Sequence, residues 1–215
     1  MVSASVSPSD RYPPRVSSIR GPVRLPDDIV PAWVNHQARS YLQGRGLTKE
    51  RVASYDLQFC SKGYMAQRII IPIYADDGSL VAYQGRSIDP NEPTRYVTQG
   101  SRPLYRPWDI SDRDSRQPLL IVEGFFDLAV VDSIIPTVAT LGVMVSPPQL
   151  AEILALLPAG FPRVLIWYDA GAEEEAFSLK LRLRPFILTD VVVSAEKDPG
   201  SMQTIQVKEV LQDYL

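Results

Sequence analysis

Apolar positions change their spacing near the middle of the chain, and the second half alternates between two patterns. Short apolar runs that predict strands lie at Leu119–Val122, Thr137–Thr140, Val164–Tyr168 and Asp190–Val193. Between and after them, apolar residues recur at helical spacing, which predicts helices at Phe126–Asp132, Ser146–Leu157, Glu173–Leu183 and Ile205–Tyr214. Because strands alternate with helices, we expect an α/β fold with a parallel sheet and helices on its faces.

The first half has a different pattern, with short helices followed by a hairpin. Ala32–Leu42 is amphipathic, and Thr48 can cap a second helix. Two extended runs, Ile69–Tyr74 and Leu80–Tyr83, flank Asp77-Gly78, a strong hairpin signal, and Arg95–Val97 predicts a further extended segment. We therefore expect a smaller mixed α+β subdomain at residues 32–117, closed by a polar linker at 109–117. The Pro-, Ser- and Arg-rich residues 1–31 predict a disordered arm.

The amino-acid composition limits the classes of protein to which the chain can belong. With 45% hydrophobic residues it can bury a core, yet no window approaches the roughly 18 uninterrupted apolar residues of a membrane helix. No signal peptide is evident, so a cytoplasmic location without a membrane partner is expected. Cys60 and His36 are the only residues of their types, which excludes an internal disulfide and a Cys/His zinc cluster.

Acidic residues follow three of the predicted strands. Glu123 and Asp127 come after the first, Asp169 after the third and Asp198 after the fourth. Carboxyl ends of parallel strands share one edge of the sheet, where α/β proteins carry their chemistry. Oxygen ligands favour Mg²⁺ or Mn²⁺, so we expect one of these ions here and no zinc.

The two halves also differ in charge. Residues 1–118 carry 16 Lys and Arg against 12 Asp and Glu, whereas residues 119–215 carry 6 against 13. A basic half beside an acidic half suits a phosphate-binding surface next to a cation site, although solvated surface charge explains the same counts. The positions of individual arginines have to decide between these interpretations.

The order of motifs between about residues 32 and 205 resembles the catalytic core of bacterial-type and bacteriophage DNA primases, which is built around a Toprim domain. The acidic half carries that family's Glu-Gly-x-x-Asp at Glu123–Asp127, a Gly before a Ser-Pro helix start at Gly142 and Ser146-Pro147, and Lys197-Asp198-Pro199. The upstream half has similar matches at Arg68–Ile73, Gly85-Arg86, Arg95-Tyr96 and Leu104-Tyr105. The resemblance assigns residues 118–215 to the Toprim domain.

This resemblance implies a nucleotidyltransferase that makes short RNA primers from ribonucleoside triphosphates on a single-stranded DNA template during replication. Metal-assisted phosphoryl transfer would use Glu123 as the catalytic acid/base. The expected metal-binding residues are Asp127, Asp169 and Asp198, with Glu173 and Glu174 as further candidates. Arginines suit phosphate oxygens and Tyr96 suits base stacking, so the expected nucleotide or nucleic-acid contacts are Arg68, Arg86, Arg95, Tyr96 and Arg102.

The sequence departs from the family pattern at the metal motifs. The second Asp of the expected Asp-x-Asp is missing, and Gly171 stands in or near its place. Glu173 or Glu174 could restore a ligand, but a solvated acidic first turn of a helix explains these glutamates equally well. Gly200 likewise occupies a position that is often acidic. Two lost carboxylates are expected to weaken metal affinity.

The zinc-binding and C-terminal helical parts of the family have no counterpart in these 215 residues. A separate zinc-binding primase subunit and a replicative helicase are therefore the expected partners, as in a split replication system encoded by a bacteriophage and working in the bacterial host cytoplasm. A catalytically degenerate module that binds nucleic acid or a replisome protein is the main alternative. A Toprim nuclease fits the acidic residues but explains the upstream motifs poorly.

Overall fold

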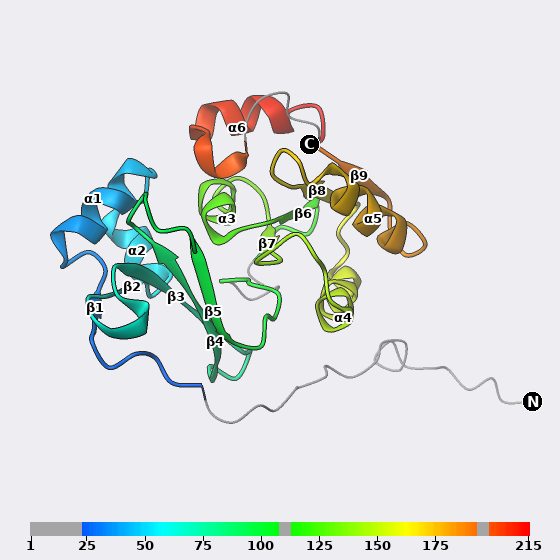
Figure 1. Cartoon of the computed structure of the whole chain (residues 1–215). Coiled ribbons are helices and arrows are strands. Elements are labelled where there is room, and N and C mark those ends of the chain that lie inside the picture. Colours follow the sequence, from blue (N-terminus) through cyan, green and yellow to red (C-terminus); the bar gives the residue numbers. More distant parts are fainter. Residues whose placement is uncertain (1–22, 108–112, 193–197) are drawn as a thin grey trace, which may run out of the picture.

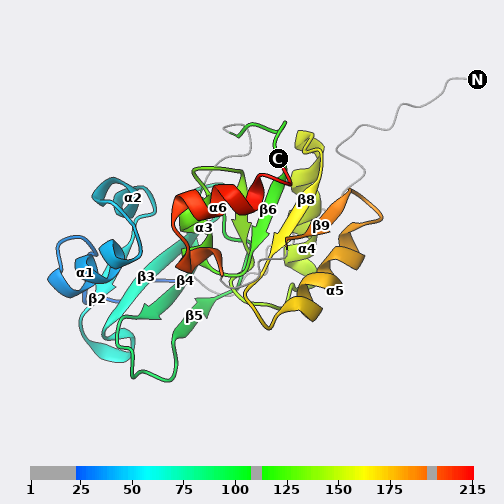
Figure 2. The same cartoon turned by 90° about the horizontal axis from the view of Figure 1, so that it is seen from above.

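Two sheets lie side by side in the computed structural model, which describes residues 23–107, 113–192 and 198–215. The first is a five-stranded antiparallel sheet and the second a four-stranded parallel sheet with helices on its faces. Figure 2 shows the two sheets next to each other with α3 and α6 beside the boundary. The predicted fold class, a parallel α/β unit preceded by a smaller mixed subdomain with a hairpin, is confirmed.

The antiparallel sheet has its strands in sequence order. They are β1 (Ile29–Pro31), β2 (Gln58–Cys60), β3 (Arg68–Tyr74), β4 (Leu80–Ser87) and β5 (Tyr96–Gly100). The predicted turn joins β3 to β4, with Gly78 at φ 80°, a conformation that favours glycine. Pro72 is tolerated inside β3 because β2 pairs only with residues 68–70, so the missing N–H deprives no neighbouring strand of a donor.

Strand β1 corrects the predicted extent of the N-terminal arm. Residues 29–31 pair with β2, and Val23 and Leu25 pack against the small core around Met65. A three-residue edge strand is too short to show periodicity, so composition alone assigned it to the arm. Residues 1–22 lie outside the described part of the chain.

The first two helices lie close to where the sequence predicts them. Helix α1 (His36–Gly44) begins after Asn35, whose side chain accepts the N–H of Ala38, so its start lies four residues later than predicted. Helix α2 (Lys49–Ser54) begins after Thr48, as predicted. Short 3₁₀ turn η2 (Gly63–Met65) then leads into β3.

The parallel sheet has the strand order β7-β6-β8-β9, which places β6 and β8 in the middle. Its strands are β6 (Leu119–Val122), β7 (Thr137–Ala139), β8 (Val164–Trp167) and β9 (Thr189–Val191). Its helices are α3 (Phe125–Val131), α4 (Pro147–Leu156), α5 (Glu173–Leu183) and α6 (Thr204–Leu211), with 3₁₀ turns η4 (Leu157–Ala159) and η5 (Pro199–Ser201). These match the predicted elements, although Val193 of the last predicted strand lies outside the described residues.

Alternate side chains of the central strands enter two separate cores. Leu120 and Val122 pack with α3 and α6, whereas Leu119 and Ile121 pack with α4 and α5 on the other face. Because both faces are covered, β6 is apolar at every position, as is usual for a buried parallel strand. The strand ends are therefore held in place from both sides.

One continuous core joins the two halves. Phe125 at the start of α3 makes edge-to-face contacts with Tyr55, Tyr105 and Phe126, with ring centroids 5.1–5.4 Å apart. Tyr105 also pairs its backbone with Ala139 of β7. The segment before the linker thus already belongs partly to the second sheet. Within the described residues, no helix is long and apolar enough to cross a membrane.

Candidate active site

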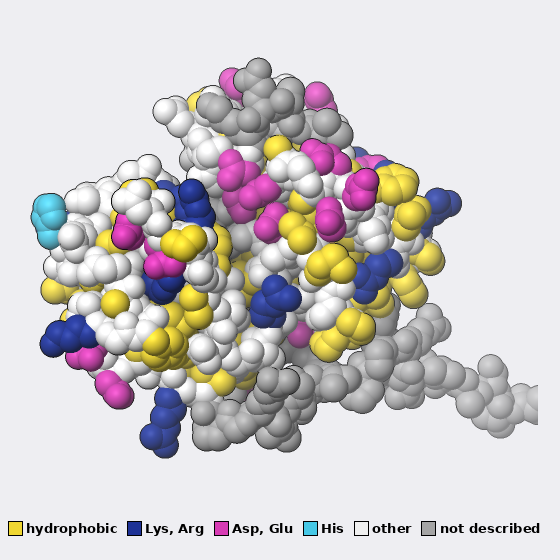
Figure 3. Space-filling model, viewed as in Figure 1, with side chains coloured by type: hydrophobic (Ala, Val, Ile, Leu, Met, Phe, Trp, Pro, Cys, Tyr) yellow, Lys and Arg dark blue, Asp and Glu magenta, His cyan; other side chains and the backbone are white. Residues whose placement is uncertain are grey.

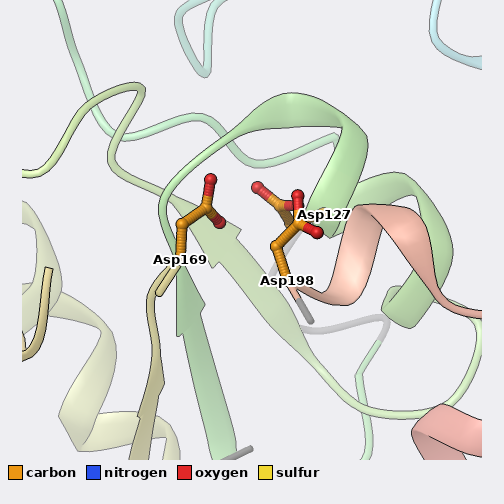
Figure 4. A group of neighbouring side chains, drawn as sticks. All are labelled: Asp127, Asp169 and Asp198. Carbon is orange, nitrogen blue, oxygen red and sulfur yellow. The ribbon is translucent and has the colours of Figure 1, made fainter. Parts of the chain in front are cut away.

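Three aspartates converge at the carboxyl edge of the parallel sheet. Asp127 lies in the first turn of α3, Asp169 follows β8 and Asp198 precedes η5. One carboxylate oxygen from each lies within 4.8 Å of the others (Figure 4). We call these three residues the acidic cluster. It brings together ligands from segments separated by up to 71 positions, as strand-end geometry predicts.

Asp127 is held by backbone donors on both oxygens. Oδ2 accepts the N–H of Gly124 at 2.9 Å, and Oδ1 accepts the N–H of Gly200 at 2.9 Å. The first bond caps α3, and the second attaches η5 to α3. Burial, together with the charges of Asp169 and Asp198, nevertheless raises the pKa of Asp127 to about 7.

One carboxylate oxygen of Asp169 is suited to bind a cation. Its Oδ1 is buried and has no hydrogen-bond partner among the described residues. A buried carboxylate oxygen without a donor is costly unless another group, such as a cation, compensates it. Burial and the nearby charge of Asp198 raise the pKa of Asp169. Hard oxygen ligands with repelling charges are the donor set that Mg²⁺ or Mn²⁺ takes, so these residues fit a divalent cation.

Glu123 lies next to the acidic cluster at the end of β6. Burial, followed by the charges of Asp169, Glu175 and Asp198 in decreasing order, raises the pKa of its carboxyl to about 7. A carboxyl group that titrates near neutral pH can both accept and release a proton under physiological conditions. This property is the one that a general acid/base needs.

The first turn of α5 supplies a different glutamate from the two that the sequence suggested. Glu173 is exposed and accepts the N–H of Gly171 at 2.9 Å, which lowers its pKa, and Glu174 is exposed as well. Neither belongs to the acidic cluster that the described residues form. Glu175 is the glutamate whose charge reaches Glu123. The signal for it was helical spacing, because 175 falls on the same face as the buried Ala172, Ala176 and Leu179.

Across from the acidic cluster, cationic and aromatic side chains of the first subdomain lie together. The Arg86 Nε donates to the Tyr41 hydroxyl at 3.0 Å, and its guanidinium lies 4.6 Å from the centre of the Tyr96 ring. The charges of both Arg86 and Asp127 act on the Tyr96 hydroxyl, which links this group to the acidic cluster. Figure 3 shows Asp and Glu side chains gathered over the parallel sheet, whereas the facing subdomain carries Lys and Arg side chains mixed with some Asp and Glu.

The remaining predicted arginines have different surroundings. Arg68 is only 5% exposed and donates to the carbonyls of Thr94 and Arg95 at 2.8 and 3.2 Å, so its guanidinium fixes the segment before β5. Arg95 is exposed, and Arg102 is exposed and donates to the carbonyl of Leu141 at 3.4 Å. Arg86 stacks on Tyr96, whose hydroxyl feels the charge of Asp127, and nucleotide or nucleic-acid contacts of Arg68, Arg86, Arg95, Tyr96 and Arg102 all stay predictions.

Comparisons with known proteins agree on the fold. No protein-family model matches the sequence, and no curated protein does. Among solved structures, a DnaG primase catalytic domain bound to ssDNA matches with a TM-score of 0.69 and 17% identity, over 85% of this chain and 74% of that one. The chain has the fold of a primase catalytic core.

Two further primase structures support this assignment of the fold. The zinc-binding and RNA polymerase domains of the Aquifex aeolicus primase match with a TM-score of 0.68 and 19% identity, covering 85% of this chain and 57% of that one. The primase fragment of the bacteriophage T7 primase-helicase matches with a TM-score of 0.61 and 16% identity, over 80% and 72% of the two chains. The primase fold is therefore common to bacterial and bacteriophage proteins among these matches.

The acidic cluster predicts a pH dependence of stability without metal. Glu123 and Asp127 have folded-state pKa values of about 7, above the ordinary 4.5 and 3.8, so their protonation favours the folded state. Their contribution to stability is present at low pH and is lost as pH rises from about 4 to above 7. Asp169→Asn removes one repelling charge and is expected to raise the free energy of unfolding at pH 8 by about 1–2 kcal/mol in EDTA, and less at pH 5.5.

Urea unfolding at the two pH values measures this difference. Glu174→Gln is the matched control, since it removes an exposed charge outside the acidic cluster. An equal effect of both substitutions at pH 8 would contradict the repulsion inferred here.

Proposed function

We propose that this chain is a primase-type nucleotidyltransferase, which joins ribonucleotides into short RNA primers on single-stranded DNA during replication. The observation that carries the proposal is the acidic cluster with Glu123 beside it, opposite Arg86 and Tyr96, on a primase fold. Because one fold can carry many functions, it is this arrangement of side chains that supports a primase.

Each group has a role in this proposal. Asp127, Asp169 and Asp198 would hold Mg²⁺ or Mn²⁺, which would neutralise negative charge on the reacting phosphate. Glu123, with a pKa of about 7, would accept the proton of the attacking ribose hydroxyl. Arg86 would bind triphosphate oxygens through its remaining N–H groups, and Tyr96 offers a partly exposed ring to a base. Glu173, whose carboxylate accepts the N–H of Gly171, remains the candidate for a replacement ligand, whereas Glu174, which is exposed and outside the acidic cluster, is given no role in this proposal.

The wider setting is also a proposal. A separate zinc-binding primase subunit would select the template, and a replicative helicase would bring the enzyme to the fork. A bacteriophage origin would account for such a division into polypeptides, with the bacterial cytoplasm as the place of action.

One observation favours a binding module as the second candidate function. Gly171 stands in or near the place where the family pattern has a second Asp, and a Cβ added there would meet nothing within 4 Å. The acidic cluster of the described residues therefore lacks that carboxylate. In this alternative the same surface binds nucleic acid without catalysis.

Incubation with labelled ribonucleotides, single-stranded DNA and Mg²⁺ or Mn²⁺ separates the candidates. Short labelled RNA is the expected product and supports a primase. Cleavage of the DNA supports a nuclease, and binding of the DNA with neither reaction supports the binding module. Because these 215 residues hold one Cys and one His, too few for a zinc-binding template module, the assay uses high template and nucleotide concentrations.

A further inference from the structure

Four large apolar side chains are exposed on α5 and on the segment that leads into β9. They are Phe177, Leu181, Phe186 and Leu188, each between 45 and 62% exposed, and we call them the apolar patch. Phe177 and Leu181 are four positions apart and therefore lie on one face of α5. Figure 3 shows hydrophobic side chains next to Lys or Arg side chains at the right of the view, where Figure 1 labels α5. Apolar side chains gathered on one surface are typical of an interaction site.

Strand β9 is an open edge of the parallel sheet beside this patch. Among the described strands it has one neighbour, β8. The carbonyl of Leu188 accepts the N–H of Val164, and alternate residues of a strand bond to the same neighbour. Thr189 and Val191 therefore turn their backbone N–H and C=O groups away from β8. An edge with such groups can pair with an added strand.

The flank of α5 that faces β9 carries both apolar and cationic side chains. Lys180 Nζ lies 3.4 Å from Asp190 Oδ1 of β9, which places Lys180 on this flank. Phe177 lies three positions before Lys180 and Arg184 four positions after it, so both share the flank. A strand added to β9 would lie along this row of side chains.

Positive charge is concentrated around the patch, although residues 119–215 are acidic as a whole. These residues carry six Lys and Arg, and four of the six lie in or near the patch: Arg163, Lys180, Arg182 and Arg184. Asp190 compensates part of this charge, because it pairs with Lys180 and with Arg163. Arg184 is exposed and takes part in no ion pair among the described residues. The excess of positive charge favours an acidic partner.

The patch lies apart from the candidate active site. Arg163 precedes β8 and Leu188 precedes β9, so both lie at the amino ends of the parallel strands. The acidic cluster lies at the carboxyl ends of the same sheet. A partner bound at the patch would therefore leave the catalytic edge accessible.

Charge also decides between the possible occupants. In a twofold dimer of this chain the same patch would face itself, so Lys180 and Arg184 would meet their own copies and repel them. Single-stranded DNA would gain little from Leu181 and Leu188, because aliphatic side chains offer phosphates no hydrogen bonds. An acidic protein segment that also carries apolar residues matches both the charge and the exposed side chains.

We propose that β9 and the apolar patch form a docking surface for an extended, acidic segment of another protein. The segment adds a strand to the β9 edge, so that backbone hydrogen bonds supply affinity and its side chains supply specificity. Its apolar residues cover Phe177 and Leu188, and its carboxylates pair with Arg184 and neighbouring cations. This surface would attach the chain to a partner without blocking the acidic cluster.

Fluorescence anisotropy of the full chain with a labelled octapeptide, in which Glu and Val alternate, tests the docking surface. Saturable binding is expected. The same octapeptide with Lys in place of Glu is expected to bind at least tenfold more weakly, because it meets like charge. Methylation of every backbone nitrogen of the Glu-containing octapeptide removes its N–H donors and is expected to weaken binding at least tenfold as well.

Variants of the protein locate the peptide on this surface. Phe177→Ala keeps a good helix former at an exposed position of α5 and is expected to weaken binding at least tenfold. Ile205→Ala is the matched control, since Ile205 is similarly exposed on α6, which covers the other face of the sheet, and less than a twofold change is expected. Arg184→Gln is expected to weaken binding, whereas Lys208→Gln, an exposed cation of α6, leaves it unchanged.

Several results would overturn the proposal. They are no saturable binding of the Glu-containing octapeptide at millimolar concentration, equal binding of the Lys-containing octapeptide, and equal binding to Phe177→Ala and the unsubstituted protein. Displacement of the octapeptide by single-stranded DNA would instead assign the surface to nucleic acid. A dimer in sedimentation that Phe177→Ala dissociates would assign it to a second copy of the chain. None of these results depends on primer synthesis, so they leave the proposed nucleotidyltransferase function untouched.

Discussion

Glu123→Gln is expected to reduce primer synthesis by about 10²–10⁴-fold, the range typical of a lost general acid/base. Glutamine has nearly the shape of glutamate but cannot accept a proton. Desolvation and the charges of Asp169, Glu175 and Asp198 raise the pKa of Glu123 to about 7, and the substitution removes this titrating group while leaving the end of β6 intact. The rate of RNA product formation, measured with saturating nucleotides, gives the effect.

Glu174→Gln is the matched control for this substitution, because it makes the same chemical change at an exposed glutamate of α5. Its rate is expected to stay within about twofold of the unsubstituted protein, as for an ordinary surface change. Wild-type rates in both variants would show that Glu123 takes no part in the chemistry.

Gly200→Ala is expected to disturb the acidic cluster through a direct steric clash. A Cβ at this position would lie 2.5 Å from Asp127 Oδ1 and 3.3 Å from the Asp127 backbone nitrogen. Since η5 packs directly on α3, either the turn or the Asp127 carboxylate has to move, and the Gly200–Asp127 hydrogen bond is lost. We expect a loss of about 1–3 kcal/mol in stability and at least tenfold weaker Mn²⁺ binding.

Gly44→Ala is the control for Gly200→Ala. A Cβ at Gly44 would meet nothing within 4 Å, and Gly44 is the last residue of α1, so alanine is expected to leave stability unchanged or to raise it slightly. Equal unfolding midpoints and equal Mn²⁺ affinities for the two variants would show that Gly200 tolerates a side chain.

The helices and strands of the parallel half could be predicted well from the sequence, because the patterns that define them lie in adjacent residues. Strand Leu119–Val122 and helix Glu173–Leu183 begin and end where the pattern predicts. Ser146 and Pro147 likewise mark the start of α4, since capping depends on adjacent residues. The three aspartates could also be predicted together, because strand ends of a parallel sheet share an edge.

Contacts between segments that are far apart in the chain could not be predicted from the sequence. The guanidinium of Arg68 donates to carbonyls 26 and 27 residues away, which no local pattern reports, while its phosphate contact stays a prediction. The stacking of Arg45 on Phe126 depends on how α1 packs against α3, and no local pattern reports that. Residues 29–31 form a strand only because β2 offers them a partner.

The central claim is that the acidic cluster still binds a divalent cation although Gly171 stands at the motif's second acidic position. Titration with Mn²⁺ at pH 7.5, followed by electron paramagnetic resonance, tests it most directly, with Asp169→Asn and Glu174→Gln as the paired variants. Saturable Mn²⁺ binding to the wild type and to Glu174→Gln, weakened at least tenfold in Asp169→Asn, is the predicted result. No saturable binding, or the same affinity in all three proteins, would contradict the account.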